Sequence, residues 1–250
     1  MAGPKPVLYN GHSQEQSIWE TRTSPVVDVG TRGSLEDGRV FYYARNSGAA
    51  IVAGQLLMSE VVSGDMDNLA VTATAVGSKT VNVTPDGTKT FALNDLLGGY
   101  MVVNDVDGEG LTYKIAGNPV TTAATAFDLT LKDGINVALT ANSQVTLLKN
   151  PWMDTVIAAA AKAHMAAGVS QVAVDAGTTD PQYFWCQTWG VSAGWDDATT
   201  AIGSPLQSGT TAGQFELLTE GAGAAGHSIG VQLFTGVATE YYPKFLQIAP

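Results

Sequence analysis

The amino-acid sequence predicts a mainly β protein: two small β-barrel or sandwich domains, an extended N-terminal arm and one short connecting helix. Three observations support this prediction. The 250 residues include 28 glycines with many threonines and valines, which favours short strands joined by tight turns. Apolar and polar residues alternate in short runs, and turn signals such as Asp-Gly separate these runs. The length is sufficient for two hydrophobic cores.

Residues 1–30 are predicted to form the arm. Pro, Gly, Ser, Thr and Gln are mixed there with isolated large side chains, and neither a helical nor a strand period emerges. A segment of this composition gains order by lying on another surface. Tyr9, Ile18 and Trp19 are its candidates for contact with that surface.

Residues 31–150 are predicted to form the first β domain. Within it, residues 38–63 indicate two strands around a turn, and residues 69–149 indicate a repeated hairpin module. A small barrel or sandwich is the expected architecture of this module. Its six expected strands are residues 69–76, 80–83, 99–104, 111–115, 127–131 and 144–148.

Residues 151–170 are predicted to connect the two β domains, with a short helix over residues 154–168. The segment is rich in alanine, which has the highest helix propensity. Asp154 is suited to cap the first turn, and Gly168 is suited to end the helix.

Residues 171–250 are predicted to form the second β domain. Its expected strands are residues 171–174, 183–189, 214–219, 230–235 and 245–248. Residues 183–190 hold four aromatic residues and the only cysteine, Cys186. As a strand, this segment is largely apolar on both faces, so it is either enclosed in a core or covered by another chain.

The charge and the cysteine content exclude several classes of protein. The formal net charge is −11, and residues 150–250 contain only Lys162 and Lys244 as bases. Such a surface argues against binding to nucleic acids or anionic membranes. A single cysteine permits no internal disulfide, and Cys186 is expected to be buried packing. The N-terminus lacks the apolar core of a signal peptide, so synthesis in a cytoplasm is expected.

No catalytic, cofactor-binding or metal-binding residues are predicted. His12, His164 and His227 lie in no recognisable motif, and an esterase-like enzyme would need one of them beside a serine and a carboxylate. The acidic residues between 104 and 109 lack the spacing of the twelve-residue calcium loop and are expected to form a turn.

The tryptophans allow two interpretations. Trp185, Trp189 and Trp195, close to Asp196 and Asp197, would suit a sugar-binding platform, because aromatic rings stack on sugar faces. The competing interpretation, favoured by the apolar neighbours of Trp185 and Trp189, is packing against a sheet.

The order of these segments resembles that of a group of tailed-phage virion proteins, the head decoration or cement proteins. Residues 184–190 look like the W-x-Q-x-W-G-like strand of that group. Residues 202–213 resemble its turn-rich segment, and residues 230–233 and 241–248 resemble its closing strands. The resemblance spans roughly residues 30–250, and the alanine run fits it less well.

The resemblance implies a non-enzymatic protein without cofactors on the outer surface of an icosahedral phage head, made in the host cytoplasm. It would stabilise the shell by bridging capsomers. The implied partners are the major capsid protein and further copies of the chain in a homotrimer, without nucleic acid or membrane. The alternative is a phage fibre or host-attachment protein that binds glycans through exposed tryptophans. The residues expected at a capsid or subunit interface are Tyr9, Ile18, Trp19, Trp185, Trp189 and Trp195.

Overall fold

The computed structural model describes residues 3–8, 15–60, 62–159, 165–177, 181–219 and 228–250. The chain divides into two compact units: residues 61–150 form one, and residues 1–60 with 151–250 form the other. This division differs from the predicted one. The boundary at residue 150 is the same, but residues 31–60 belong with the C-terminal part of the chain. Local sequence signals cannot show this, because the joining contacts are between strands far apart in sequence.

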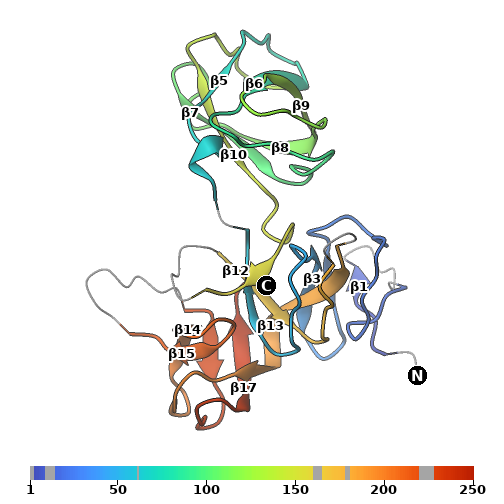
Figure 1. The fold of residues 1–250 in the computed structure, drawn as a ribbon, viewed down its shortest axis with the longest axis vertical. Coiled ribbons are helices and arrows are strands. Elements are labelled where there is room, and N and C mark those ends of the chain that lie inside the picture. Colours follow the sequence, from blue (N-terminus) through green and yellow to red (C-terminus); the bar gives the residue numbers. More distant parts are fainter. Residues whose placement is uncertain (1–2, 9–14, 61, 160–164, 178–180, 220–227) are drawn as a thin grey trace. The chain divides into compact units, whose positions relative to one another are not determined.

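Residues 61–150 form a closed six-stranded β-barrel (Figure 1). Neighbouring strands follow the order β10-β5-β6-β9-β8-β7, and β7 closes the barrel on β10. All six strands were predicted from turn signals and alternation, and the closed barrel is one of the two architectures, barrel or sandwich, that were expected. The strands are β5 (Leu69–Val71), β6 (Thr80–Thr84), β7 (Tyr100–Asp105), β8 (Thr112–Gly117), β9 (Phe127–Leu131) and β10 (Gln144–Leu148).

The barrel encloses one apolar core. In β9 the side chains alternate strictly, so Phe127, Leu129 and Leu131 are buried and the residues between them are exposed. The same alternation in β6 and β7 adds Val81, Val83, Met101 and Val103 to this core. One helical turn, the 3₁₀ segment η1 (Gly64–Met66), precedes the barrel strands and buries Met66.

The other unit contains an eleven-stranded antiparallel sheet. Its main path follows the order β1-β2-β3-β13-β17-β16-β14-β15, and β12 links β13 to β4, which pairs with β11. The strands are β1 (Val7–Leu8), β2 (Arg32–Ser34), β3 (Val40–Arg45), β4 (Leu56–Met58), β11 (Val156–Ile157), β12 (Ala166–Ser170), β13 (Tyr183–Trp195), β14 (Pro205–Ser208), β15 (Phe215–Leu217), β16 (Gly230–Gln232) and β17 (Tyr241–Gln247).

The long strand β13 is the centre of this sheet. Its first half pairs with β3 and its second half with β17. The change of partner coincides with a β-bulge between Gln187 and Trp189 and with Gly190, whose φ of 89° suits a residue without Cβ. The first half is buried on both faces within the chain, as the enclosed-strand interpretation requires: Trp185 packs on one side and Phe184 with Cys186 on the other.

The predicted helix over residues 154–168 is wrong in the part of this segment that the structure describes. Val156 and Ile157 form β11, and β12 begins at Ala166. Pairing of these strands with β4 overrides the helix propensity of alanine. Gly168 ends no helix: it lies in β12 with φ 138°, where a Cβ would meet Sγ of Cys186 at 2.6 Å.

The predicted pair of strands around a turn in residues 38–63 is also wrong in its pairing. The two strands exist as β3 and β4, but β3 pairs with β2 and β13, while β4 pairs with β11 and β12. Met58 in β4 lies opposite Val156 in β11. The barrel is therefore inserted in the sequence between two neighbouring strands of the sheet.

Candidate functional site

The second half of β13 and its neighbours present an apolar sheet face to solvent. Directly opposed residues of an antiparallel ladder share a face, and one such row crosses four strands from Val191 through Phe245 and Val231 to Pro205. We call this surface the outer sheet face. Its residues are Trp189, Val191, Ala193, Trp195, Pro205, Val231, Tyr241, Pro243, Phe245 and, at one end opposite Trp189, the polar Gln247. None of them is charged.

Aromatic rings of β13 and β17 pair across this face. Trp189 meets Phe245 edge to face, with ring centroids 5.7 Å apart. Trp195 stacks on Tyr241 at 6.2 Å with an interplanar angle of 17°. Val191 lies between the two pairs along β13 and is 51% exposed. Two aromatic pairs flanking an exposed valine form an apolar surface of the kind found in the centre of protein interfaces.

The opposite side of the same strands is buried and contains the polar side chains. The residues that alternate with the outer face include Ser192, Lys244 and Gln232, all of which are buried, and Asp196 follows at the end of β13. Leu246 lies on this side too and packs with Phe215. This arrangement inverts the usual order, in which polar side chains of a one-sided sheet face water.

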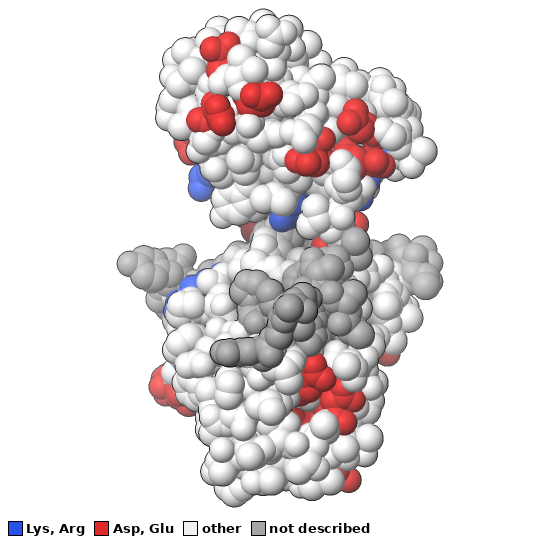
Figure 2. Space-filling view, turned by 90° about the vertical axis from the view of Figure 1, so that its left-hand side faces the viewer, with Lys and Arg blue, Asp and Glu red and all other residues white. Residues whose placement is uncertain are grey.

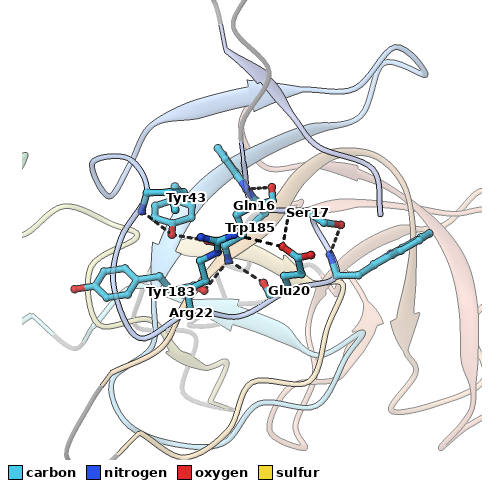
Figure 3. Close-up of polar contacts among 9 residues, drawn as sticks. Gln16, Ser17, Glu20, Arg22, Tyr43, Tyr183 and Trp185 are labelled. Atoms are coloured by element: carbon cyan, nitrogen blue, oxygen red, sulfur yellow. Dashed lines mark hydrogen bonds and ion pairs between the residues drawn. The ribbon is translucent and has the colours of Figure 1, made fainter. Parts of the chain in front are cut away.

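The N-terminal segment covers the first half of β13 and is held there by a polar network (Figure 3). The side-chain amide of Gln16 donates to the carbonyl oxygens of Glu20, at 2.8 Å, and Tyr183, at 2.9 Å. The Tyr43 hydroxyl donates to Oε1 of Gln16 at 2.6 Å. Nε1 of Trp185 donates to the carbonyl oxygen of Gln16 at 3.1 Å. A single buried glutamine thus ties the segment to β3 and β13.

The hydrogen bonds of this network hold the N-terminal segment on β3 and β13. Burial raises the pKa of the Tyr43 hydroxyl to about 12, so the hydroxyl remains a hydrogen-bond donor at neutral pH. An open groove of about 550 Å³ adjoins the network, lined by Thr21, Arg22, Thr23, Ser24, Pro25, Val26 and Gln182.

The structure separates the six predicted interface residues into different environments. Ile18 and Trp185 are completely buried in one cluster with Phe41 and Tyr43, so their assignment to an interface is corrected: they have no surface to offer a partner. Trp19, in contrast, is 58% exposed. Tyr9 lies outside the described residues.

Trp189 and Trp195 are partly exposed and lie together on the outer sheet face. Sequence reasoning missed Val191, Tyr241 and Phe245 as members of that face. The sequence of residues 241–247 carries no clear alternation of polar and apolar residues, because Phe245 and Leu246 are adjacent apolar residues. Lys244 also misleads, since lysine normally lies on the solvent side of a strand but is buried here.

The described residues hold no cluster of potential metal ligands. Within them, no three His, Cys, Asp or Glu side chains gather as ligands. His12, His164 and His227 all lie outside the described residues, so the enzyme hypothesis built on them has no geometry to assess. Cys186 is fully buried, and burial raises its pKa well above its ordinary value, which disfavours the reactive thiolate.

The described part of the chain holds no helix long and apolar enough to cross a membrane. Comparison with protein-family models, with curated proteins and with solved structures gave no match for this chain.

Proposed function

We propose that this chain is a non-enzymatic structural protein of a phage virion, a head decoration protein that docks on the outer surface of the capsid and braces neighbouring capsomers. The proposed partners are the major capsid protein and further copies of the chain in a homotrimer. The observation that carries the proposal is the outer sheet face: an uncharged, aromatic surface on a chain whose formal net charge is −11.

Leaving such an apolar face in water costs free energy. Contiguous exposed apolar patches are rare on soluble monomers and mark interaction sites. Acidic residues outnumber basic ones on the surface drawn in Figure 2, where they form separate clusters on a largely uncharged surface. Two copies of a chain with a formal net charge of −11 therefore repel each other where these clusters approach. A face without charge is where such a chain meets a copy of itself or a capsid at the least electrostatic cost.

Assembly would also supply the affinity. A trimer brings three weakly binding faces to a repetitive shell, so each contact after the first is intramolecular and total avidity rises well above that of one subunit. Synthesis in the host cytoplasm and location on the virion exterior follow from the same proposal.

The test compares two valine-to-glutamate variants. Val191→Glu places a carboxylate in the centre of the outer sheet face, whereas Val76→Glu places one at a similarly exposed valine of the barrel. Sedimentation with undecorated capsids of the encoding phage and light scattering on the free chain measure capsid binding and oligomeric state. We expect Val191→Glu to lose capsid binding, oligomerisation or both, and we expect Val76→Glu to keep both properties. A wild-type chain that neither oligomerises nor binds capsids would overturn the proposal.

A host-attachment protein that binds glycans is the second candidate, favoured by the Trp195–Tyr241 stack on the same face. Sugar rings stack on such aromatic surfaces through their C–H faces. A glycan array probed with the wild-type chain and with Trp195→Ala separates the candidates. Glycan binding lost in Trp195→Ala would favour attachment, whereas absence of glycan signal with retained capsid binding would favour decoration.

A further inference from the structure

A lysine and an aspartate are buried against each other on the inner side of the sheet. Lys244 extends from β17, and Asp196 directly follows β13; Nζ and Oδ1 are 2.8 Å apart, and neither side chain has any exposed area. The Phe215 ring covers the ammonium, with its centroid 5.2 Å from Nζ. A Cβ at Gly194 would meet Cδ of Lys244 at 2.7 Å, and one at Gly236 would overlap the Asp196 carboxylate. The pair is therefore tightly enclosed.

The enclosure offers fewer hydrogen bonds than two charged groups require. An ammonium has three donors, and a carboxylate has about four acceptor positions. Besides Asp196, Nζ of Lys244 reaches the carbonyl oxygen of Tyr242 at 3.4 Å. The carboxylate receives one directed hydrogen bond, from Nε2 of Gln232 to Oδ2 at 3.0 Å. Oδ1 lies 2.8 Å from Nζ of Lys244 and has no other donor among the described residues.

These partners match an amide better than an ion pair. A secondary amide has one donor and one carbonyl oxygen, and the enclosure supplies an acceptor at Tyr242 and a donor at Gln232 on the corresponding sides. Burying an ion pair with incomplete hydrogen bonding costs free energy that the mutual attraction does not repay. Removing both charges removes that cost.

We propose that Lys244 and Asp196 become joined by an isopeptide bond between Nζ and Cγ. After a proton passes from the ammonium to the carboxylate, the free amine attacks Cγ, and the new N–C bond forms. The bond between Cγ and Oδ1 breaks, and Oδ1 departs as water with a proton from Nζ. Oδ2 remains as the amide oxygen. No oxidant or further reactant is consumed.

Three physical effects favour this step. The reacting groups are held in contact, which replaces an encounter by an intramolecular reaction. Burial lowers the pKa of Lys244 below its ordinary value, against the opposing effect of Asp196, so the free amine is easier to reach than on an exposed lysine. The Gln232 amide, already on Oδ2, stabilises the negative charge that develops there during attack.

The reaction is expected to be slow. Among the described residues, no third carboxyl group hydrogen-bonds the pair, so the proton must pass directly between the reacting groups. The product would tie β17 to the end of β13 and close a covalent loop around β14, β15 and β16. Such a link stabilises by constraining the unfolded chain, as a disulfide does, in a protein whose single cysteine cannot form one. This inference stands independently of the proposed function.

Intact-mass spectrometry of the denatured full-length chain, fresh and after prolonged incubation at neutral pH, provides the test. We expect a species lighter than the sequence mass by one water, increasing with time. Because no Lys or Arg lies between Lys162 and Lys244, the unlinked chain gives the tryptic peptides 163–244 and 245–250. The linked chain should instead give one uncut peptide, residues 163–250, that is lighter by one water and whose fragmentation shows a closed loop from Asp196 to Lys244. An unchanged mass after incubation, or a tryptic peptide that ends at unmodified Lys244 in full yield, would overturn the proposal.

Two controls make the mass change specific. Lys244→Met should retain its full sequence mass, because it has no amine at this site. Succinimide formation at Asp-Gly sequences such as Asp86-Gly87 also removes one water, but succinimides hydrolyse in mild base and the isopeptide does not. Water loss that maps to Asp-Gly would count against the proposal. The wild-type peptide map decides the question even if the variant fails to fold.

Discussion

The barrel and the large-sheet unit bury different kinds of side chain. The barrel has one apolar cluster, supplied by alternating strand residues and by loop residues such as Phe91, and it buries a few polar groups such as Asn118 and Thr121. The large-sheet unit has three smaller apolar clusters and more buried polar groups, which include Gln16, Gln187 and the Lys244–Asp196 pair. The difference indicates that polar contacts between residues far apart in sequence contribute more to the second unit than to the barrel.

The largest loss of stability should come from a substitution in the buried cluster of Ile18, Phe41, Tyr43 and Trp185, which holds the N-terminal segment on the sheet. Trp185→Ala removes a fully buried indole and its hydrogen bond to Gln16, which should cost about 3–5 kcal/mol. Urea unfolding followed by circular dichroism should show an earlier transition for the large-sheet unit, with the barrel transition unchanged. A shift of both transitions together would show that the two units do not unfold independently.

A smaller loss of stability is expected when only the hydrogen bonds of the Gln16 side chain are removed. Gln16→Ala removes the acceptor of the Tyr43 hydroxyl proton and one of the two donors to the Tyr183 carbonyl, which keeps the Arg22 N–H, and we expect stability to fall by about 1–3 kcal/mol. Hydrogen exchange should increase in residues 15–26 and stay constant in the barrel. Thr125→Ala, at an exposed barrel turn, is the matched control; an equal loss there would contradict the distinction between the units.

A small pH effect is expected at Asp197. Burial opposes ionisation there, but hydrogen bonds from Thr210 and Thr211 outweigh it and hold the pKa below its ordinary value. Folding therefore favours the charged form of Asp197. Its contribution to the free energy of unfolding is complete above the unfolded-state pKa and is lost as pH falls through the folded-state pKa. The stability difference between wild type and Asp197→Asn, measured by urea unfolding, should shrink on acidification. A constant difference would contradict this role.

The smallest change in the stability of the large-sheet unit is expected from removing the barrel. Because β4 and β11 are neighbours, replacing residues 61–150 by a short Gly/Ser linker rejoins two strands that already pair. The shortened chain should fold with the stability of the large-sheet unit in the full chain, and residues 61–150 should fold by themselves. Nuclear magnetic resonance spectra of each piece check this; collapse of either piece would show that the units stabilise each other.

The candidate site was only partly predictable. Trp185 and Trp189 were expected at an interface as part of a strand that is apolar on both faces, and Trp195 because it lies close to Asp196 and Asp197. Ile18 was expected there as an isolated large residue of the arm, yet Ile18 and Trp185 pack in one buried cluster with Tyr43. Composition identifies residues whose burial is favourable, but it does not show whether the chain itself or a partner covers them.

The sequence by itself determined the β class, the six barrel strands and the central apolar strand at residues 183–189, because alternation and turn residues act over a few positions. Tertiary structure alone decided three matters: that residues 31–60 join the C-terminal unit, that the alanine-rich segment contributes β11 and β12, and that Lys244 points inward to Asp196. Each depends on hydrogen bonds or charges between residues distant in sequence, and these override local propensity once they form.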